Sequence, residues 1–152
     1  MYRLIGDNHV LDGLPYSAQV FLRALDSVRR DLARDAGLTG GELSALGRIA
    51  EESEIALPNL AEYLELAETA AGDVVAALAA RDLVAATTTG AVTTLDLTPA
   101  GHVLMEKVYL DFQASINEAA SSLDDERLYA FDSSLLKMAR KLDAAATAPS
   151  AG

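Results

Sequence analysis

The chain contains no cysteine among its 152 residues. Disulfides, thiolate nucleophiles and cysteine-ligated zinc or iron–sulfur centres are therefore excluded. No segment approaches the roughly 18 uncharged apolar residues of a membrane-spanning helix. The first residues also lack the apolar stretch of an export signal. We therefore expect a cytoplasmic protein that does not associate with a membrane.

Basic residues are scarce, with 12 Lys and Arg against 23 Asp and Glu and a net charge of −11. Residues 1–38 carry five of each sign, residues 39–101 carry ten acids against Arg48 and Arg81, and residues 102–152 carry eight acids against five bases. Affinity for DNA comes largely from Lys and Arg at phosphates. The acidic middle segment therefore argues against DNA binding through many ion pairs.

Arrangements of catalytic side chains are also lacking. His9 and His102 are the only histidines, and neither has carboxylates at metal-ligand spacing. The carboxylate runs at residues 51–54 and 124–126 fall at expected helix ends, in contact with water. The sequence predicts no enzyme, no metal site and no cofactor.

Apolar residues at helical spacing predict a first helix from about residue 15 to 34, with Pro15 in its first turn. Thr39-Gly40-Gly41-Glu42 has the form of a capping box, which predicts that a second helix starts there and runs to about Glu52. The apolar residues predicted to be buried in these two helices are Phe21, Leu25, Val28, Leu32, Leu43, Leu46 and Ile49.

Residues 55–57 form a short extended piece, and Pro58 is suited to begin a third helix that runs to Leu66. Residues 68–81 predict a fourth helix, in which Gly72 costs about 1 kcal/mol relative to alanine. We expect this helix to bury Val74, Val75 and Leu78.

The periodicity changes between residues 83 and 97, where threonine, valine and alanine flank Thr88-Thr89-Gly90. This pattern predicts a β-hairpin with its turn at those three residues. A long helix should begin at Thr98-Pro99, and a last helix should follow a break at residues 121–125. We expect residues 144–152 to be a flexible tail.

Four segments together resemble the signature of the MarR family of regulators: LAEYLEL at residues 60–66, VVxxL at 74–78, ARDLV at 80–84 and LTPAG at 97–101. The resemblance implies a mainly α-helical fold with a small β-hairpin wing. In that fold residues 1–152 form a single domain, with a winged helix-turn-helix lobe at residues 39–101. Residues 15–38 and 102–143 would form the helical dimerisation region of a homodimer.

The resemblance also implies three sets of functional residues. Those expected to face DNA, from the recognition helix and the wing, are Thr69, Ala70, Gly72, Asp73, Ala76, Thr87, Thr88 and Thr89. Those expected near a cleft for a small-molecule effector are Tyr16, Arg23, Tyr63, Met105 and Tyr109, although packing is the commoner role for such side chains. Those expected in the dimer interface are Phe21, Phe112, Ile116, Leu128, Phe131, Leu135 and Met138.

The sequence departs from the family pattern in the residues that should contact DNA. Asp73 stands where the family commonly has arginine, Ala71 and Ala77 add no polar group to the expected exposed face, and residues 85–95 carry no charge. Losing about three phosphate contacts per subunit would cost roughly three decades of affinity.

Two hypotheses follow. The first is a dimeric, ligand-responsive MarR-like transcriptional regulator with weak or atypical DNA contacts. The second is an acidic winged-helix protein that does not bind DNA. It would act as an antirepressor, as a heterodimer partner of a basic regulator, or as a DNA mimic.

Overall fold

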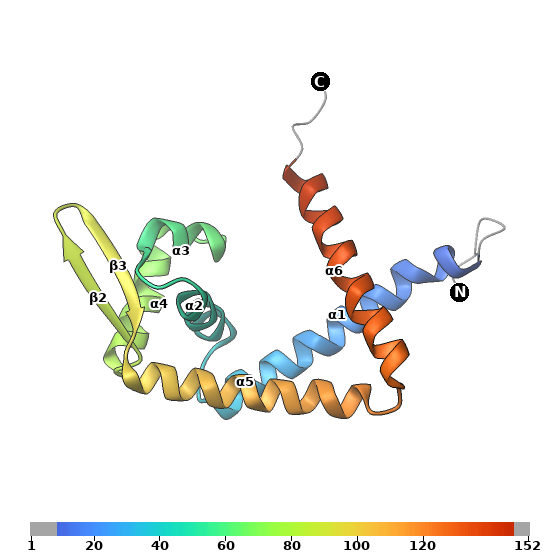
Figure 1. Cartoon of the computed structure of the whole chain (residues 1–152). Coiled ribbons are helices and arrows are strands. Elements are labelled where there is room, and N and C mark those ends of the chain that lie inside the picture. The colour runs from blue at the N-terminus through green and yellow to red at the C-terminus, as the bar shows by residue number, and fades with distance from the viewer. Residues whose placement is uncertain (1–8, 148–152) are drawn as a thin grey trace, which may run out of the picture. The chain divides into compact units, whose positions relative to one another are not determined.

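The computed structural model describes residues 9–147 and the side chains of residues 14–144. The chain forms two compact units, one ending at Gln113 and the other beginning at Ala114. The first unit contains α1 (His9–Asp35), α2 (Gly40–Glu51), β1 (Ile55–Ala56), α3 (Leu57–Tyr63), α4 (Glu68–Ala80), β2 (Val84–Thr89), β3 (Val92–Leu97) and most of α5 (Pro99–Ala120), and the second contains the end of α5 and α6 (Asp125–Thr147) (Figure 1).

The first helix is longer than predicted. It begins at His9, so Pro15 lies inside α1 and the prediction that it occupies the first turn is wrong. Proline has no backbone N–H and cannot donate to the carbonyl of the residue four positions earlier. The helix therefore continues past Pro15 with one backbone hydrogen bond fewer.

The predicted capping box at the start of α2 is confirmed. The side-chain oxygen of Thr39 accepts a hydrogen bond from the backbone N–H of Glu42 at 3.1 Å. The carboxylate of Glu42 in turn accepts from the backbone N–H of Thr39 at 2.7 Å. Two backbone donors that the helix leaves unpaired are thus satisfied, which fixes where α2 begins.

Helix α3 has Pro58 in its first turn, as predicted, but it ends at Tyr63 rather than at Leu66. Glu65 adopts a positive φ of 55°, and the N–H of Leu66 donates to the carbonyl of Ala61 at 3.0 Å. This left-handed residue closes the helix and turns the chain towards α4.

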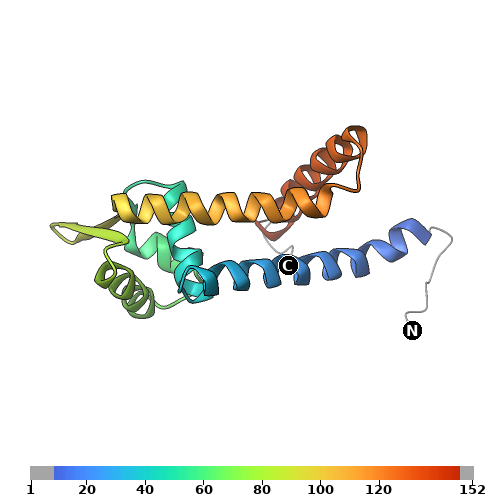
Figure 2. The ribbon, with the colours of Figure 1, turned by 90° about the horizontal axis from the view of Figure 1, so that it is seen from below.

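The predicted hairpin is confirmed and belongs to an antiparallel sheet of order β1-β3-β2. Thr89 pairs with Val92, so the loop consists of Gly90, with φ +63°, and Ala91. A glycine at the first position suits a two-residue hairpin turn. The turn therefore lies slightly later than predicted, because Thr88 and Thr89 belong to β2. Figures 1 and 2 both show the hairpin projecting beyond the helices of this unit.

The core of the first unit lies between α2, α3, α4 and the sheet. Its largest fully buried side chains come from the three helices and from β1 and β3, so one core joins these helices to the sheet. They are Leu46, Ile49, Ile55, Leu60, Leu78 and Leu95.

In the second unit, α6 begins after Asp124, whose carboxylate accepts a hydrogen bond from the backbone N–H of Arg127 at 2.9 Å. The predicted break between α5 and α6 is confirmed at residues 121–124. Helix α6 continues to Thr147, so residues 144–147 are helical and not part of a flexible tail. The rest of the predicted tail, residues 148–152, lies outside the described residues.

Candidate nucleic-acid interface

Helix α4 buries one face and exposes the opposite one. Ala71, Val75 and Leu78 are buried in the core. Thr69, Asp73 and Ala76 are exposed, at steps of four and three residues. This spacing places the three exposed residues in one stripe along the helix. We call Thr69, Asp73 and Ala76 the outward stripe.

Three of the other residues expected to be exposed on α4 are less accessible. Ala70 and Gly72 are half-buried beside the outward stripe. Ala71 is fully buried, so the prediction that it is exposed is wrong. The reason is geometric, because Ala71 lies one helical turn before Val75 and shares its core-facing side.

Residues 85–92 of the hairpin are all exposed and uncharged. Thr87, Thr88 and Thr89 are all exposed on β2. The hydroxyls of Thr88 and Thr93 are hydrogen-bonded across the hairpin at 3.1 Å. Thr94 donates through its hydroxyl to the carbonyl oxygen of Thr87 at 3.4 Å. The hairpin therefore offers hydroxyl groups to a partner. Some of these hydroxyls already make hydrogen bonds within the sheet.

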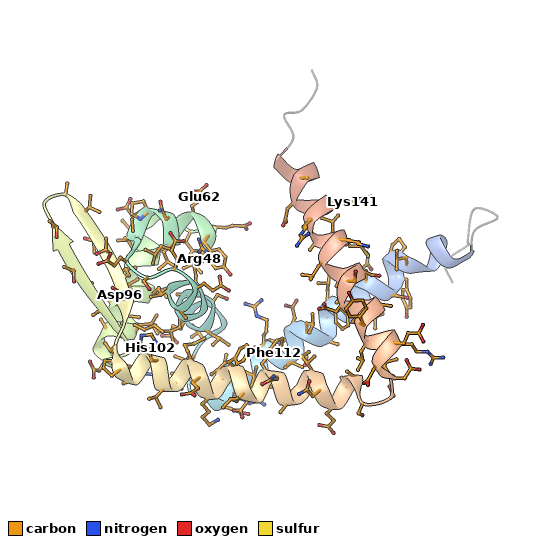
Figure 3. The ribbon with its side chains drawn as sticks, in the orientation of Figure 1. Arg48, Glu62, Asp96, His102, Phe112 and Lys141 are labelled. Atoms are coloured by element: carbon orange, nitrogen blue, oxygen red, sulfur yellow. The ribbon has the colours of Figure 1, made fainter. Side chains whose placement is uncertain are left out.

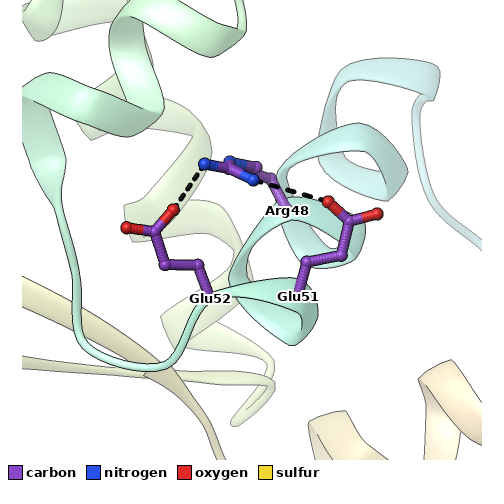
Figure 4. A network of polar contacts seen from close by, with 3 residues as sticks. All are labelled: Arg48, Glu51 and Glu52. Carbon is purple, nitrogen blue, oxygen red and sulfur yellow. Dashed lines mark hydrogen bonds and ion pairs between the residues drawn. The ribbon is translucent and has the colours of Figure 1, made fainter. Parts of the chain in front are cut away.

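Arg48 is one of the two basic residues of the segment 39–101, and it is held within the lobe. Its guanidinium forms ion pairs with Glu51, at 3.5 Å, and with Glu52 (Figure 4). It also lies over the ring of Tyr63, 5.3 Å from the centroid. Figure 3 shows Arg48 on α2, within the lobe, whereas Glu62 projects from α3. The charge of Arg48 therefore serves the packing of α2 against α3.

Arg81, the other basic residue of this segment, is also engaged. Its guanidinium donates to the carbonyl oxygens of Gly37, at 2.8 Å, and Ala36, at 3.3 Å. These bonds tie the end of α4 to the loop between α1 and α2. Local sequence pattern could not predict this contact, because the residues are more than 40 positions apart.

The connection from the hairpin to α5 is fixed by Thr98. Its hydroxyl accepts from the backbone N–H of Gly101 at 3.0 Å and donates to the carbonyl oxygen of Asp82 at 2.5 Å. At the same end of the hairpin, Asp96 accepts from the backbone N–H of Glu54 at 3.0 Å. The C-terminal end of β3 is therefore anchored both to the turn that follows α4 and to the residue before β1.

A pocket of about 310 Å³ lies on another side of the first unit. It includes Tyr63, Met105 and Tyr109, so the structure brings together three of the five residues predicted for a ligand cleft. Tyr16 and Arg23, both exposed on α1, are not among the residues that line it. The remaining lining residues are Arg29, Leu32, Leu43, Ser44, Gly47, Glu51, Val108 and Phe112.

The polar groups at this pocket are partly paired. Arg29 donates to the hydroxyl of Ser44 at 2.8 Å, across the pocket wall formed by α1 and α2. On the neighbouring stretch of α5, Lys107 donates to Asp111 at 2.6 Å. This hydrogen bond and the charge of Asp111 raise the pKa of Lys107 above its ordinary value, so the amine stays charged at neutral pH.

The residues predicted for a dimer interface fall on α1, α5 and α6. On α5, Phe112 and Ile116 are half-buried, as is Leu128 on α6. The others are exposed, although each is large and apolar: Phe21, Phe131, Leu135 and Met138. Helix α6 also exposes Tyr129, Leu136 and Leu142.

Among the side chains described, those of residues 14–144, no group of three or more His, Asp or Glu is placed to hold a metal ion. Of the helices described, none is both long and apolar enough to cross a membrane. His102 is exposed in the first turn of α5. The side chain of His9 lies outside the described residues.

A helix with one exposed stripe, preceded by a short supporting helix and followed by an exposed hairpin, defines a winged helix-turn-helix lobe. Comparison with solved structures specifies the fold further. The chain resembles a MarR family protein from Bacillus stearothermophilus with a TM-score of 0.83 and 20% identity, covering 91% of this chain and 99% of that one. The protein has the winged helix-turn-helix fold of the MarR family.

Two further structures agree. The transcriptional regulator Tm0710 from Thermotoga maritima matches with a TM-score of 0.66 and 20% identity, over 90% of this chain and 99% of that one. MepR, a transcription regulator of the Staphylococcus aureus multidrug efflux pump MepA, matches with a TM-score of 0.66 and 16% identity, over 82% and 97%. Both of these neighbours are transcription regulators. No family model and no curated protein matches the chain.

Proposed function

We propose that the protein is a homodimeric transcription regulator that contacts DNA through α4 and the β2–β3 hairpin and makes few ion pairs with phosphates. The observation that supports this most is the outward stripe of α4, which is exposed in the same lobe as an exposed hairpin. A recognition helix and a wing need such accessibility to enter adjacent grooves. The regulators with the same fold support the assignment to this class.

Contact with DNA would rely on backbone and hydroxyl donors. The residue before α4 is Ala67, which provides no side-chain cap. The N–H groups of the first turn of α4 therefore remain available to a phosphate. Thr69 and the hairpin threonines add hydroxyls that can bond to bases or phosphates. Asp73, on the same stripe, would repel a phosphate and weaken the complex.

The homodimer is proposed from the apolar surface of α6. Phe131, Leu135 and Met138 are 38–45% exposed at steps of four and three residues. Such a stripe on a helix is costly to leave in water and is typical of a helix that packs against another. A second copy that buries α6, with α1 and α5 completing the interface, would cover these side chains.

The pocket lined by Tyr63, Met105 and Tyr109 is the proposed effector site. Its wall is largely aliphatic and aromatic, with Arg29 and Glu51 as charged residues, which suits a small apolar molecule with a polar group. Tyr63 is the last residue of α3, and its ring lies under the guanidinium of Arg48. A ligand that displaced this ring would act directly on the helix that supports α4.

A second candidate function is favoured by the charges of the lobe. Arg48 and Arg81 are both engaged by contacts inside the first unit, whereas Glu62, Glu65, Glu68 and Asp73 are exposed around α3 and α4. An acidic surface of this kind is complementary to a basic protein. The lobe would then act as an antirepressor, as a partner of a basic regulator, or as a DNA mimic.

One experiment separates the two functions. The purified protein is titrated into a labelled DNA fragment from upstream of its own coding sequence, at low salt, and binding is followed by fluorescence anisotropy. A regulator of the proposed type binds this fragment more tightly than a scrambled one. If neither fragment binds while a basic winged-helix regulator is retained on the immobilised protein, the second function is correct and the first is wrong.

A further inference from the structure

Strand β2 forms an outer edge of the sheet and lacks the features that usually prevent edge strands from pairing. Among the described residues, the strand order β1-β3-β2 leaves one side of β2 without a neighbouring strand. Residues 85–92 are all exposed, and none of them is charged or is a proline. Proteins commonly protect such an edge with lysine, proline or a bulge, because its free N–H and C=O groups are a template for another strand.

The register of the hairpin shows which backbone groups are free. Thr89 pairs with Val92 across the two-residue loop, and the N–H of Thr98 donates to the carbonyl of Leu83 at 3.1 Å. Hydrogen-bonded pairs alternate along an antiparallel ladder, so the odd-numbered residues of β2 bond to β3. The N–H and C=O groups of Ala86 and Thr88 therefore point away from β3, to the open edge. Those of Val84 point the same way but belong to a buried residue.

We infer that this edge pairs with β2 of a second copy of the chain, in antiparallel orientation. With Ala86 opposite Ala86 of the second copy, the two alanines exchange a pair of backbone hydrogen bonds, and Thr88 of each chain lies opposite the start of the other strand at Val84. The side chains brought together are alanine, threonine and valine. They are small and uncharged, so they neither overlap nor repel one another.

The charge distribution favours a second copy as the occupant. The chain has a net charge of −11, so most of its surface repels a second copy. Residues 85–95 carry no charge of either sign, and the free edge of the hairpin is therefore a place where two copies can approach without this repulsion. The contact is separate from the helical interface of the proposed homodimer. Two dimers joined through their hairpins would form a larger assembly.

Sedimentation equilibrium over a concentration series tests the pairing. In an Ala86→Lys variant, the new positive charge of one chain would lie opposite the same positive charge of the second copy. Ala76→Lys makes the same charge change on the exposed face of α4 and serves as the control. We expect wild type and Ala76→Lys to pass from dimer to larger species as concentration rises, and Ala86→Lys to remain a dimer. The pairing is wrong if wild type never exceeds a dimer, or if Ala86→Lys associates as wild type does.

A cross-linking experiment gives a second readout that does not depend on adding a charge. The natural chain has no cysteine, so Ala86→Cys introduces a single thiol. Directly opposed residues of a hydrogen-bonded pair have Cα atoms about 5.5 Å apart, within the range that a disulfide spans. We expect mild oxidation to cross-link Ala86→Cys at least tenfold faster than Ala76→Cys, and equal rates would overturn the pairing. Neither readout uses DNA, so failure of the proposed DNA binding would leave both unaffected. The sedimentation series takes the proposed helical homodimer as its starting species, whereas the cross-linking rate does not depend on that homodimer.

Discussion

Gly101 lies directly against the backbone of Leu83. A Cβ atom placed on Gly101 would be 2.1 Å from the carbonyl oxygen of Leu83, far inside any permitted contact. The same carbonyl accepts the N–H of Thr98 at 3.1 Å. Only glycine therefore allows the first turn of α5 to pack against the start of the hairpin, which explains the final glycine of the LTPAG segment.

Substitution of this glycine should destabilise the fold. We expect Gly101→Ala to lower the free energy of unfolding by about 1–3 kcal/mol, the usual range for overpacking. The reason is that the added Cβ would meet the backbone of Leu83, which cannot move aside as a flexible side chain can. Gly72→Ala is the matched control. Its Cβ would meet no atom within 4 Å in α4, so it should stabilise the protein by about 0.5–1 kcal/mol. Urea unfolding of both variants measures the difference, and equal effects would refute the account of Gly101.

Removal of the capping box should weaken α2. We expect Thr39→Ala to lower the free energy of unfolding by about 0.5–2 kcal/mol, because the N–H of Glu42 loses its acceptor. Thr69→Ala, on the exposed face of α4, should change stability by less than about 0.5 kcal/mol. Chemical denaturation followed by circular dichroism compares the two. A Thr69 effect as large as that of Thr39 would contradict the assignment of the cap.

The apolar stripe of α6 should be needed for the homodimer. Leu135→Glu places a carboxylate on that stripe, so we expect a shift from dimer to monomer in sedimentation velocity. Ser134→Glu adds the same charge to the neighbouring exposed residue, whose hydroxyl bonds only within the helix, to the carbonyl of Ala130. This control should remain a dimer. A dimeric Leu135→Glu protein would exclude α6 from the interface.

Much of the architecture could be predicted because it depends on local pattern. The capping box at Thr39 and the hairpin between residues 83 and 97 are specified by residues close together in the chain. The start of α1 could not be predicted, because Pro15 is tolerated inside that helix despite the lost hydrogen bond. The end of α3 depends on the left-handed conformation of Glu65, a residue type that gives no such signal.

The candidate site was harder to predict than the fold. Arg48 and Arg81 count in the sequence as two charges of the lobe, but the ring of Tyr63 under Arg48 and the carbonyl bonded by Arg81 come near only in the folded chain. Arg81 reaches the carbonyl of Gly37, which lies 44 positions earlier. In the same way, Tyr63 and Tyr109 share a pocket, whereas Tyr16 does not line it. Helical spacing alone cannot distinguish these tyrosines.

Reversal of the charge on the outward stripe should strengthen DNA binding. Asp73→Arg replaces a carboxylate that repels phosphate with a group that can bind it, so we expect higher affinity. The plot of log affinity against log salt should also steepen by about 0.9 for each new phosphate contact. Glu118→Arg makes the same charge change on α5, outside the lobe, and should have a much smaller effect. Equal effects of the two variants would show that α4 does not face DNA.

The salt dependence of the wild-type protein tests the central claim most directly, namely that the lobe binds DNA with few ion pairs. Affinity for the upstream fragment is measured by anisotropy at several salt concentrations. We expect binding at low salt, with a slope of log affinity against log salt no steeper than about −2. A slope near −6, as about six to seven phosphate contacts produce, or no binding at low salt, would contradict the proposal.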